Sequence, residues 1–138
     1  MQFLAQARAL AHELVRMNEG ASSPVSDVRG GLSGWQQAKL TEFIEEHLGE
    51  ELSLASLAQL VHLSPFHFSR AFKQSFGMPP HRYLTSRRID RAKVLLAERK
   101  LSVTEIGLDV GFSETSSFTS AFRKLTGETP TEYRRSLA

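Results

Sequence analysis

The chain predicts helices almost throughout, because its apolar residues recur at intervals of three and four positions and not at alternate ones. From residue 35 onward this spacing predicts helices over about 35–48, 54–61, 65–76, 80–98, 103–110 and 114–126, and a short last helix that begins at Thr129. Another amphipathic helix is expected over 3–17. No segment has the pattern of a strand, so we expect an all-α protein.

Residues with known preferences for helix ends agree with these boundaries. Serines precede four of the helices as candidate N-caps, at Ser53, Ser64, Ser102 and Ser113. Glu105 follows Ser102 by three positions, which completes the pattern of a capping box. Glycines end two helices and prolines begin the helices that follow, at Gly77 and Pro80 and again at Gly127 and Pro130.

One short unit occurs twice in the chain. LSLASLAQLVHLS at 52–64 matches LSVTEIGLDVGFS at 101–113, and FSRAFKQSFGMPPHRY at 68–83 matches FTSAFRKLTGETPTEY at 118–133. The shift changes from 49 to 50 because the second copy has one extra residue after its serine. Each copy has a short helix, a tight turn and a second helix, which is the pattern of a helix-turn-helix. Ala58 and Gly107 stand at the matched position where we expect the two helices to approach closely.

The second helix of each copy has an apolar side that recurs and a polar side that differs. The inner side carries Phe68, Ala71, Phe72, Ser75 and Phe76 in the first copy, and Phe118, Ala121, Phe122 and Leu125 in the second. The opposite side carries Phe66, Ser69, Arg70 and Lys73 in the first copy, and Ser116, Thr119, Ser120 and Arg123 in the second. This pattern predicts one scaffold that presents two different recognition surfaces.

Charge is concentrated in the middle of the chain. Residues 63–100 hold nine Lys/Arg against two Asp/Glu, a net charge of +7, although the whole chain carries only +2. Such a block attracts polyanions, but it is also compatible with a solvated helix face. Its basic run has the same two interpretations, DNA-backbone contacts or ion pairs with acids on neighbouring helices, and comprises Arg82, Arg87, Arg88, Arg91 and Lys93.

Several kinds of chemistry are not expected. There is no cysteine, which excludes disulfides and thiolate catalysis and is compatible with a reducing cytoplasm. No apolar run approaches the roughly 20 residues that span a bilayer. The five histidines form no i,i+4 pair, and no histidine lies near the hydroxyl-rich segment 113–120 as a base. We therefore expect no enzyme activity, no metal and no cofactor.

The motifs resemble the DNA-binding domain of the AraC/XylS family of bacterial transcription regulators, over about residues 35–138. The resemblance is carried by LSLASLAQLVHLSPFHFSRAFKQSFG (52–77), by RRIDRAKVLL (87–96), and by IGLDVGF (106–112) followed by SSFTSAFRKLTGETPTEYR (116–134). It implies two helix-turn-helix subdomains in a homeodomain-like tandem, joined by a long helix. About 18 residues in that helix span ~27 Å, the same order as one ~34 Å turn of DNA. The two second helices would then read successive major grooves of an asymmetric site.

Base-reading and phosphate-binding roles follow from this resemblance. The base-reading positions correspond to Pro65, Phe66, Ser69 and Arg70 in the first copy and to Thr115, Ser116, Ser117, Thr119 and Ser120 in the second. Phosphate contacts are expected from His67, Lys73, Arg123 and Lys124. Arginine pairs well with guanine, whereas hydroxyls accept several base edges. We expect the first copy to supply most of the base specificity.

The resemblance also suggests a domain organisation. We expect a helix at 1–17 that is the remnant of a sensor or dimerisation domain, a linker at 18–34, and the tandem domain at 35–138, divided into 35–78, 80–98 and 101–138. The chain fits either a complete short protein or, as we favour, a piece of a longer regulator. We expect a cytoplasmic regulator that binds duplex DNA. RNA polymerase is expected as a partner if the protein is an activator, and a second copy of the chain is a further candidate partner, in a dimer. The alternative is a protein-interaction module that modulates a related regulator through the N-terminal helix.

Overall fold

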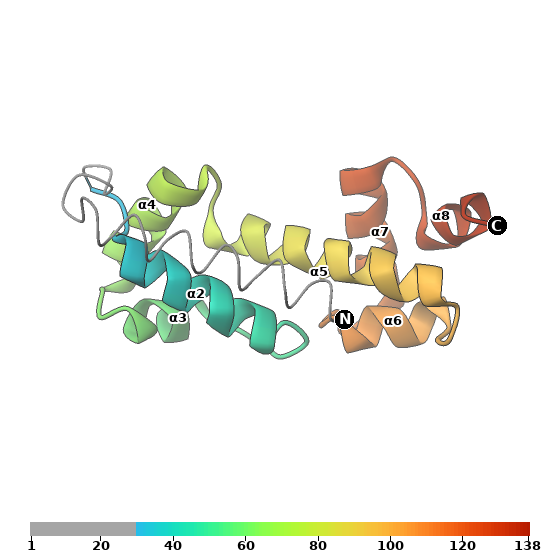
Figure 1. The fold of residues 1–138 in the computed structure, drawn as a ribbon, viewed down its shortest axis with the longest axis horizontal. Coiled ribbons are helices and arrows are strands. Elements are labelled where there is room, and N and C mark those ends of the chain that lie inside the picture. The colour runs from blue at the N-terminus through green and yellow to red at the C-terminus, as the bar shows by residue number, and fades with distance from the viewer. Residues whose placement is uncertain (1–29) are drawn as a thin grey trace. The chain divides into compact units, whose positions relative to one another are not determined.

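A computed structural model describes residues 30–138, and every regular element in this part of the chain is a helix (Figure 1). The helices are α2 (Gly34–Glu46), α3 (Leu54–Leu60), α4 (Pro65–Phe76), α5 (Pro80–Glu98), α6 (Val103–Asp109), α7 (Thr115–Thr126) and α8 (Pro130–Ser136). The all-α prediction is thus confirmed. The helix predicted over 3–17, and with it the interaction module that would use it, lies outside the described residues.

The chain divides into two compact units, each with one helix-turn-helix. The described part of the first unit comprises residues 30–46 and Ser53–His81, and therefore contains α3 and α4. The second comprises His47–Leu52 and Arg82–Ala138, and contains α6, α7 and α8. The boundary falls in the first turn of α5, so this helix belongs almost entirely to the second unit. The loop between α2 and α3 also belongs to the second unit.

In the first unit, the apolar sides of α2, α3 and α4 are buried. Fully or nearly fully buried side chains include Leu40, Ile44, Leu57, Ala58, Val61, Phe68, Ala71 and Phe72. The side-chain amide of Gln36 on α2 donates to the Val61 carbonyl, at 3.1 Å, at the end of α3. The Leu32 amide donates to the Ser75 hydroxyl on α4, at 2.7 Å. These long-range bonds hold the start of the described chain and α2 to the helix-turn-helix.

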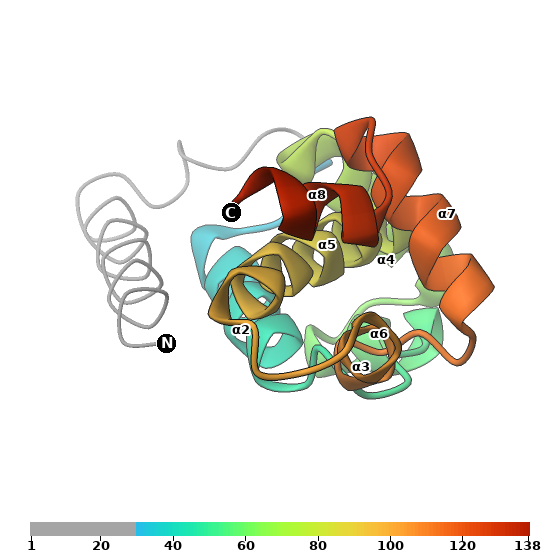
Figure 2. The ribbon, with the colours of Figure 1, turned by 90° about the vertical axis from the view of Figure 1, so that its right-hand side faces the viewer.

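The second unit is built around α5, with α6 and α8 on opposite sides of it (Figures 1 and 2). Its core contains Ile89, Ala92, Leu95, Leu96, Ile106, Val110, Phe118 and Phe122. A Cβ placed on Gly107 would lie 2.8 Å from a ring carbon of Phe118. The close approach expected at this position is therefore confirmed, because α6 lies directly against the Phe118 ring.

The turns of the two helix-turn-helix motifs each have one residue with a positive φ at the matched position, but the residue and the value of φ differ. His62 in the first turn has φ of 60°, and Gly111 at the matched position in the second has φ of 110°. The His62 ring stacks on Trp35, with ring centroids 6.4 Å apart. A Cβ at Gly111 would collide with the guanidinium of Arg88. The second turn therefore needs glycine both for its backbone conformation and for the space that Arg88 occupies.

Two predictions about α7 are wrong. Ser113 does not cap this helix: the N-cap is Glu114, which makes no side-chain capping bond, and the helix begins at Thr115. The extra residue of the second copy moves the serine one position away from the helix start. Leu125, expected on the buried side, is 46% exposed, since the core contacts of α7 end at Phe122. The remaining helix ends agree with prediction to within two residues.

Candidate nucleic-acid interface

The predicted first reading surface lies along one side of α4. Ser64 caps the helix by accepting a bond from the His67 amide, and Pro65 occupies the first turn. Phe68, Ala71 and Phe72 are buried, which fixes the rotation of the helix and turns its other side to solvent. The predicted residues on that side are all exposed except the partly buried Ser69, namely Pro65, Phe66, His67, Ser69, Arg70 and Lys73.

The side chains of this surface also contact one another. The Arg70 guanidinium lies over the Phe66 ring, with Cζ 5.7 Å from the ring centroid. The Phe66 ring meets the His67 ring edge-on, with centroids 6.0 Å apart. His67 Nδ1 lies 3.0 Å from the Ser64 hydroxyl oxygen, which ties the imidazole to the start of the helix. The surface is thus partly organised before any ligand binds.

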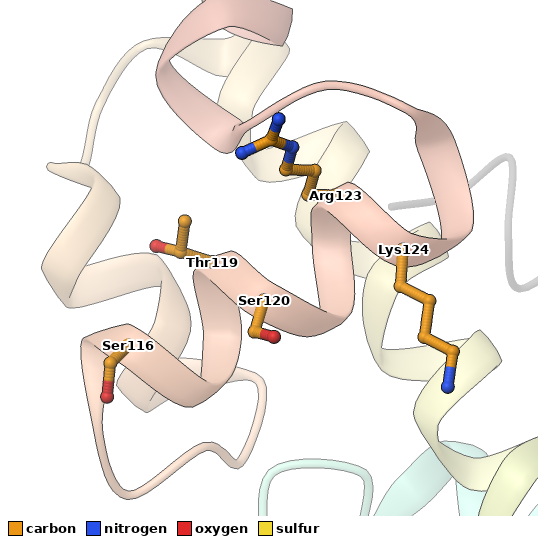
Figure 3. A pocket seen from close by; sticks show the side chains of 5 residues that line it. All are labelled: Ser116, Thr119, Ser120, Arg123 and Lys124. Carbon is orange, nitrogen blue, oxygen red and sulfur yellow. The ribbon is translucent and has the colours of Figure 1, made fainter.

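The predicted second reading surface lies on α7, where Phe118 and Phe122 are buried. Figure 3 shows five of its side chains lining a shallow hollow along the outer side of the helix, namely Ser116, Thr119, Ser120, Arg123 and Lys124. Thr115 and Ser117 are exposed in the first turn. The structure therefore brings hydroxyls together in the first two turns of α7 and cations in the last.

The two surfaces differ in the charge that they present. On α4 the cations Arg70 and Lys73 are both exposed, and the first turn has no acid. On α7 the Glu114 carboxylate stands at the start of the helix, and the Ser116 hydroxyl donates to it over 3.5 Å. Sequence reasoning missed Glu114 as part of this surface. The extra residue in the second copy was the available signal, since it shifts the helix start by one position.

The basic run on α5 has several different roles. Arg88 donates from Nε to the Leu48 carbonyl at 2.9 Å, and from a terminal nitrogen to the Glu50 carbonyl at 2.7 Å. Its guanidinium also lies over the Phe112 ring, with Cζ 6.0 Å from the ring centroid. Burial lowers the pKa of Arg88 below its ordinary value. This arginine therefore holds the loop between α2 and α3 to the second unit, through backbone carbonyls and not through an acid.

Another member of the run makes an ion pair on its own helix. Arg87 lies 3.0 Å from the Asp90 carboxylate, three residues further along α5. Both side chains are partly exposed, so this pair contributes little to stability. Arg82 is exposed, whereas Arg91 and Lys93 are partly buried. Arg87 thus forms an ion pair, but this pair lies within α5 and is not the expected pair with an acid on a neighbouring helix.

Metal sites and membrane-spanning helices are absent from the described part of the chain. Residues 30–138 contain no group of three or more His, Cys, Asp or Glu that could hold a metal ion. No helix in this range is both long and apolar enough to cross a membrane. The surfaces on α4 and α7 are the ones that carry the predicted reading residues.

Comparisons with known proteins agree with this architecture. Residues 57–136 match the model of a helix-turn-helix domain family. The chain is 39% identical over 95 residues to the probable transcriptional regulator LumQ of Photobacterium leiognathi, a match that covers 69% of this chain and 38% of LumQ. It is 38% identical over 95 residues to an uncharacterized helix-turn-helix-type transcriptional regulator, YobQ, of Bacillus subtilis, covering 69% of this chain and 39% of that protein. The chain thus spans less than half the length of these curated relatives.

Solved structures show the same likeness. A transcriptional regulator from Chromobacterium violaceum, described as of the AraC type, superposes with a TM-score of 0.69 at 33% identity, over 75% of this chain and 92% of that one. The DNA-binding domain of AdpA, solved in complex with a target DNA, superposes with a TM-score of 0.69 at 29% identity, over 72% of this chain and 89% of that one. The chain therefore belongs to the AraC-type helix-turn-helix family of transcriptional regulators.

Proposed function

We propose that this chain binds a specific sequence of double-stranded DNA and regulates transcription from it. The main support is the pair of reading surfaces. In its own unit, each of α4 and α7 buries phenylalanines at matching positions, yet the two helices present different exposed side chains. A related DNA-binding domain, that of AdpA, has been solved with its target DNA. The second helix of a helix-turn-helix enters the major groove in proteins that use this motif. The activity is binding, with no catalytic step.

We further propose that α4 supplies most of the base discrimination. Arg70 can form two hydrogen bonds with O6 and N7 of a guanine, a contact that contributes about 1–3 kcal/mol of discrimination. Phe66 and Ser69 lie on the same side of α4 as Arg70, and Pro65 lies in the first turn of this helix. The hydroxyls of α7, at Thr115, Ser116, Ser117, Thr119 and Ser120, accept several base edges and so discriminate weakly. The phosphate contacts come from His67, Lys73, Arg123 and Lys124, which position the protein.

Two helices on one chain favour an asymmetric site, with α4 and α7 in successive major grooves and a footprint of about two DNA turns. We place the regulator in the bacterial cytoplasm, where it would act on the chromosome. RNA polymerase is the further partner if the protein is an activator. Dimerisation is a separate proposal, which sedimentation of the full chain with and without DNA can test.

The decisive experiment is a selection of bound duplexes from a random DNA pool, made with the wild-type chain, with Arg70→Ala and with Ser120→Ala. Ser120 occupies the position on α7 that matches Arg70 on α4, so the two variants are matched controls for each other. We expect Arg70→Ala to lose a guanine preference of about 5- to 150-fold, and Ser120→Ala to change the selected sequence far less. A wild-type chain that selects no sequence would refute the proposed function. Equal losses in both variants would refute the division of labour between α4 and α7.

A further inference from the structure

Phe66 is a large apolar side chain that the protein leaves in water. It is 68% exposed, the largest exposed fraction among the large apolar side chains of residues 30–138. A single exposed apolar residue is common on protein surfaces and means little by itself. Phe66 matters because of where it lies: it stands on the predicted reading surface of α4, with the Arg70 guanidinium over its ring and the His67 ring packed against it.

The helix itself accounts for this contact. Residues four apart on a helix are neighbours, and long side chains lean back toward the N-terminus, so Arg70 falls over Phe66. The face of an aromatic ring attracts a cation. No carboxylate within residues 30–138 forms an ion pair with Arg70 that would draw the guanidinium away. The ring is in turn steadied by His67, whose Nδ1 is held by the Ser64 hydroxyl.

We infer that Phe66 is a positioning residue that holds the Arg70 guanidinium for a guanine and covers the methyl group of an adjacent thymine on the same strand. This inference rests on the proposed function and adds a ligand to it: a thymine–guanine step, read by two side chains that act together. An arginine already held against a ring loses less conformational freedom on binding. The ring supplies the apolar contact that a thymine methyl prefers, beside the two acceptors of the guanine.

The second reading surface serves as an internal comparison. Ser116 and Ser120 occupy the positions on α7 that match Phe66 and Arg70 on α4. Neither can form a cation–ring pair, and the Ser116 hydroxyl instead donates to Glu114. A thymine–guanine preference should therefore appear only in the half of the DNA site that α4 contacts.

The binding test uses the full chain and its selected duplex, together with two altered duplexes. In one, the thymine next to the guanine is replaced by uracil, which removes only the 5-methyl group. In the other, the guanine is replaced by 7-deazaguanine, which removes one acceptor. The proteins are wild type, Phe66→Leu, Arg70→Lys and the double variant. Phe66→Leu keeps an apolar side chain at an exposed position, so the fold should survive.

We expect the wild type to bind the uracil duplex about two- to fivefold more weakly, and Phe66→Leu to lose this difference. Phe66→Leu should also reduce sensitivity to 7-deazaguanine, although it touches no acceptor of the guanine. The double variant should lose about two- to fivefold less affinity than the product of the two single losses. As a matched control, Lys73→Gln should weaken binding to all duplexes alike.

A measurement on the free protein tests the positioning directly. The side-chain Nε–H signal of Arg70 in a nitrogen–proton spectrum should be displaced by the ring of Phe66, and Phe66→Leu should move it to the position of an ordinary exposed arginine. An unchanged Arg70 signal would overturn the inference, as would losses that multiply without coupling. If sequence preference persists in either case, the proposed function stands. A wild-type chain without any sequence preference would refute both the inference and the proposed function.

Discussion

At Gly107 a hydrogen atom stands where nearly every other residue would place a carbon. The Phe118 ring fills the space, with ring and side-chain carbons between 2.8 and 3.2 Å from where a Cβ would lie. These atoms belong to a fully buried side chain in the core of the second unit. The ring therefore has little freedom to move away, because protein interiors are close-packed.

We predict that Gly107→Ala destabilises the protein. Overpacking costs about 1–3 kcal/mol, and the better helix propensity of alanine offsets about 1 kcal/mol of it. The free energy of unfolding, from urea titration followed by circular dichroism, should fall by up to about 2 kcal/mol. Leu108→Ala is the control, because its side chain is 55% exposed on the same helix and should change stability by only about 0.5 kcal/mol. A Gly107→Ala variant as stable as wild type would show that Phe118 can move.

Single residues also show which side-chain contacts could be predicted from the sequence and which could not. Gly107 was predictable, since a mid-helix glycine needs a packing reason and its match, Ala58, is also small. The role of Arg88 was not predictable from spacing, because its partners are backbone carbonyls 38 and 40 residues away in the chain. A carbonyl has no signature in the sequence, whereas an acid would have had one. The contact between Phe66 and Arg70 was within reach, as an i,i+4 pair on a helix.

At the scale of whole elements, the two short helices α6 and α8 begin in the same way. Each has a capping box, formed by Ser102 with Glu105 and by Thr129 with Glu132. In both, the backbone N–H of the capping residue donates to the glutamate carboxylate, at 2.8 Å. These bonds, together with the bond to the capping residue's side chain, lower the pKa of each glutamate below its ordinary value.

A pH dependence follows from these lowered pKa values. A carboxylate whose pKa is lower in the folded protein stabilises the fold above the ordinary glutamate pKa of 4.5. This stabilisation disappears as the pH falls from about that value through the lower pKa of the folded state. We predict that the double variant Glu105→Gln, Glu132→Gln is less stable than wild type at pH 7, and that the difference shrinks toward pH 2.5.

Urea midpoints measured from pH 7 to pH 2.5 would test this. Glu51→Gln is a suitable control, because Glu51 is exposed in the loop before α3 and caps no helix. A difference that stays constant across the whole range would contradict the assignment of the two carboxylates.

Helix ends illustrate both the strength and the limit of sequence interpretation. The caps at Ser53, Ser64, Ser102 and Thr129 were local patterns and were correctly predicted. Ser113 has the same appearance, but one extra residue before α7 separates it from the helix. N-cap preference indicates which residues suit the N-cap position. It does not indicate whether the backbone places such a residue there. The change of the repeat shift from 49 to 50 already indicated that Ser113 is one residue too far from α7 to cap it.

At the scale of the whole molecule, the proposed phosphate contacts should appear in the response to salt. Each phosphate neutralised by a cation releases counterions, so affinity falls with salt concentration. We predict that Lys73→Gln combined with Arg123→Gln lowers the slope of log affinity against log salt by about two, and weakens binding to all sequences alike. Lys100→Gln, an exposed lysine between α5 and α6, should leave the slope unchanged. A normal slope in the double variant would exclude these two side chains as phosphate contacts.

The fold class and the helix order could be predicted because they depend on periodicity and on residues close together in the chain. The membership of His47–Leu52 in the second unit could not, since it depends on contacts with α5 and with the backbone at Asp109, where a Cβ on Gly49 would collide. For the site, the helical wheel predicted most of the exposed residues of α4 and α7, although not Leu125. The position of the Glu114 carboxylate beside Ser116 depends on three-dimensional placement.

Arg88 has a consequence for mutational scanning. A screen for loss of the proposed DNA binding would recover changes at this residue as well as changes at Arg70, and both arginines would be assigned to DNA contact from their charge. The Arg88 guanidinium is instead occupied by the Leu48 and Glu50 carbonyls and fills the space beside Gly111. Its loss would lower the amount of folded protein, and so reduce occupancy of every operator equally. Scans of such regulators therefore need a folding readout beside the reporter, or scaffold arginines will be counted as recognition residues.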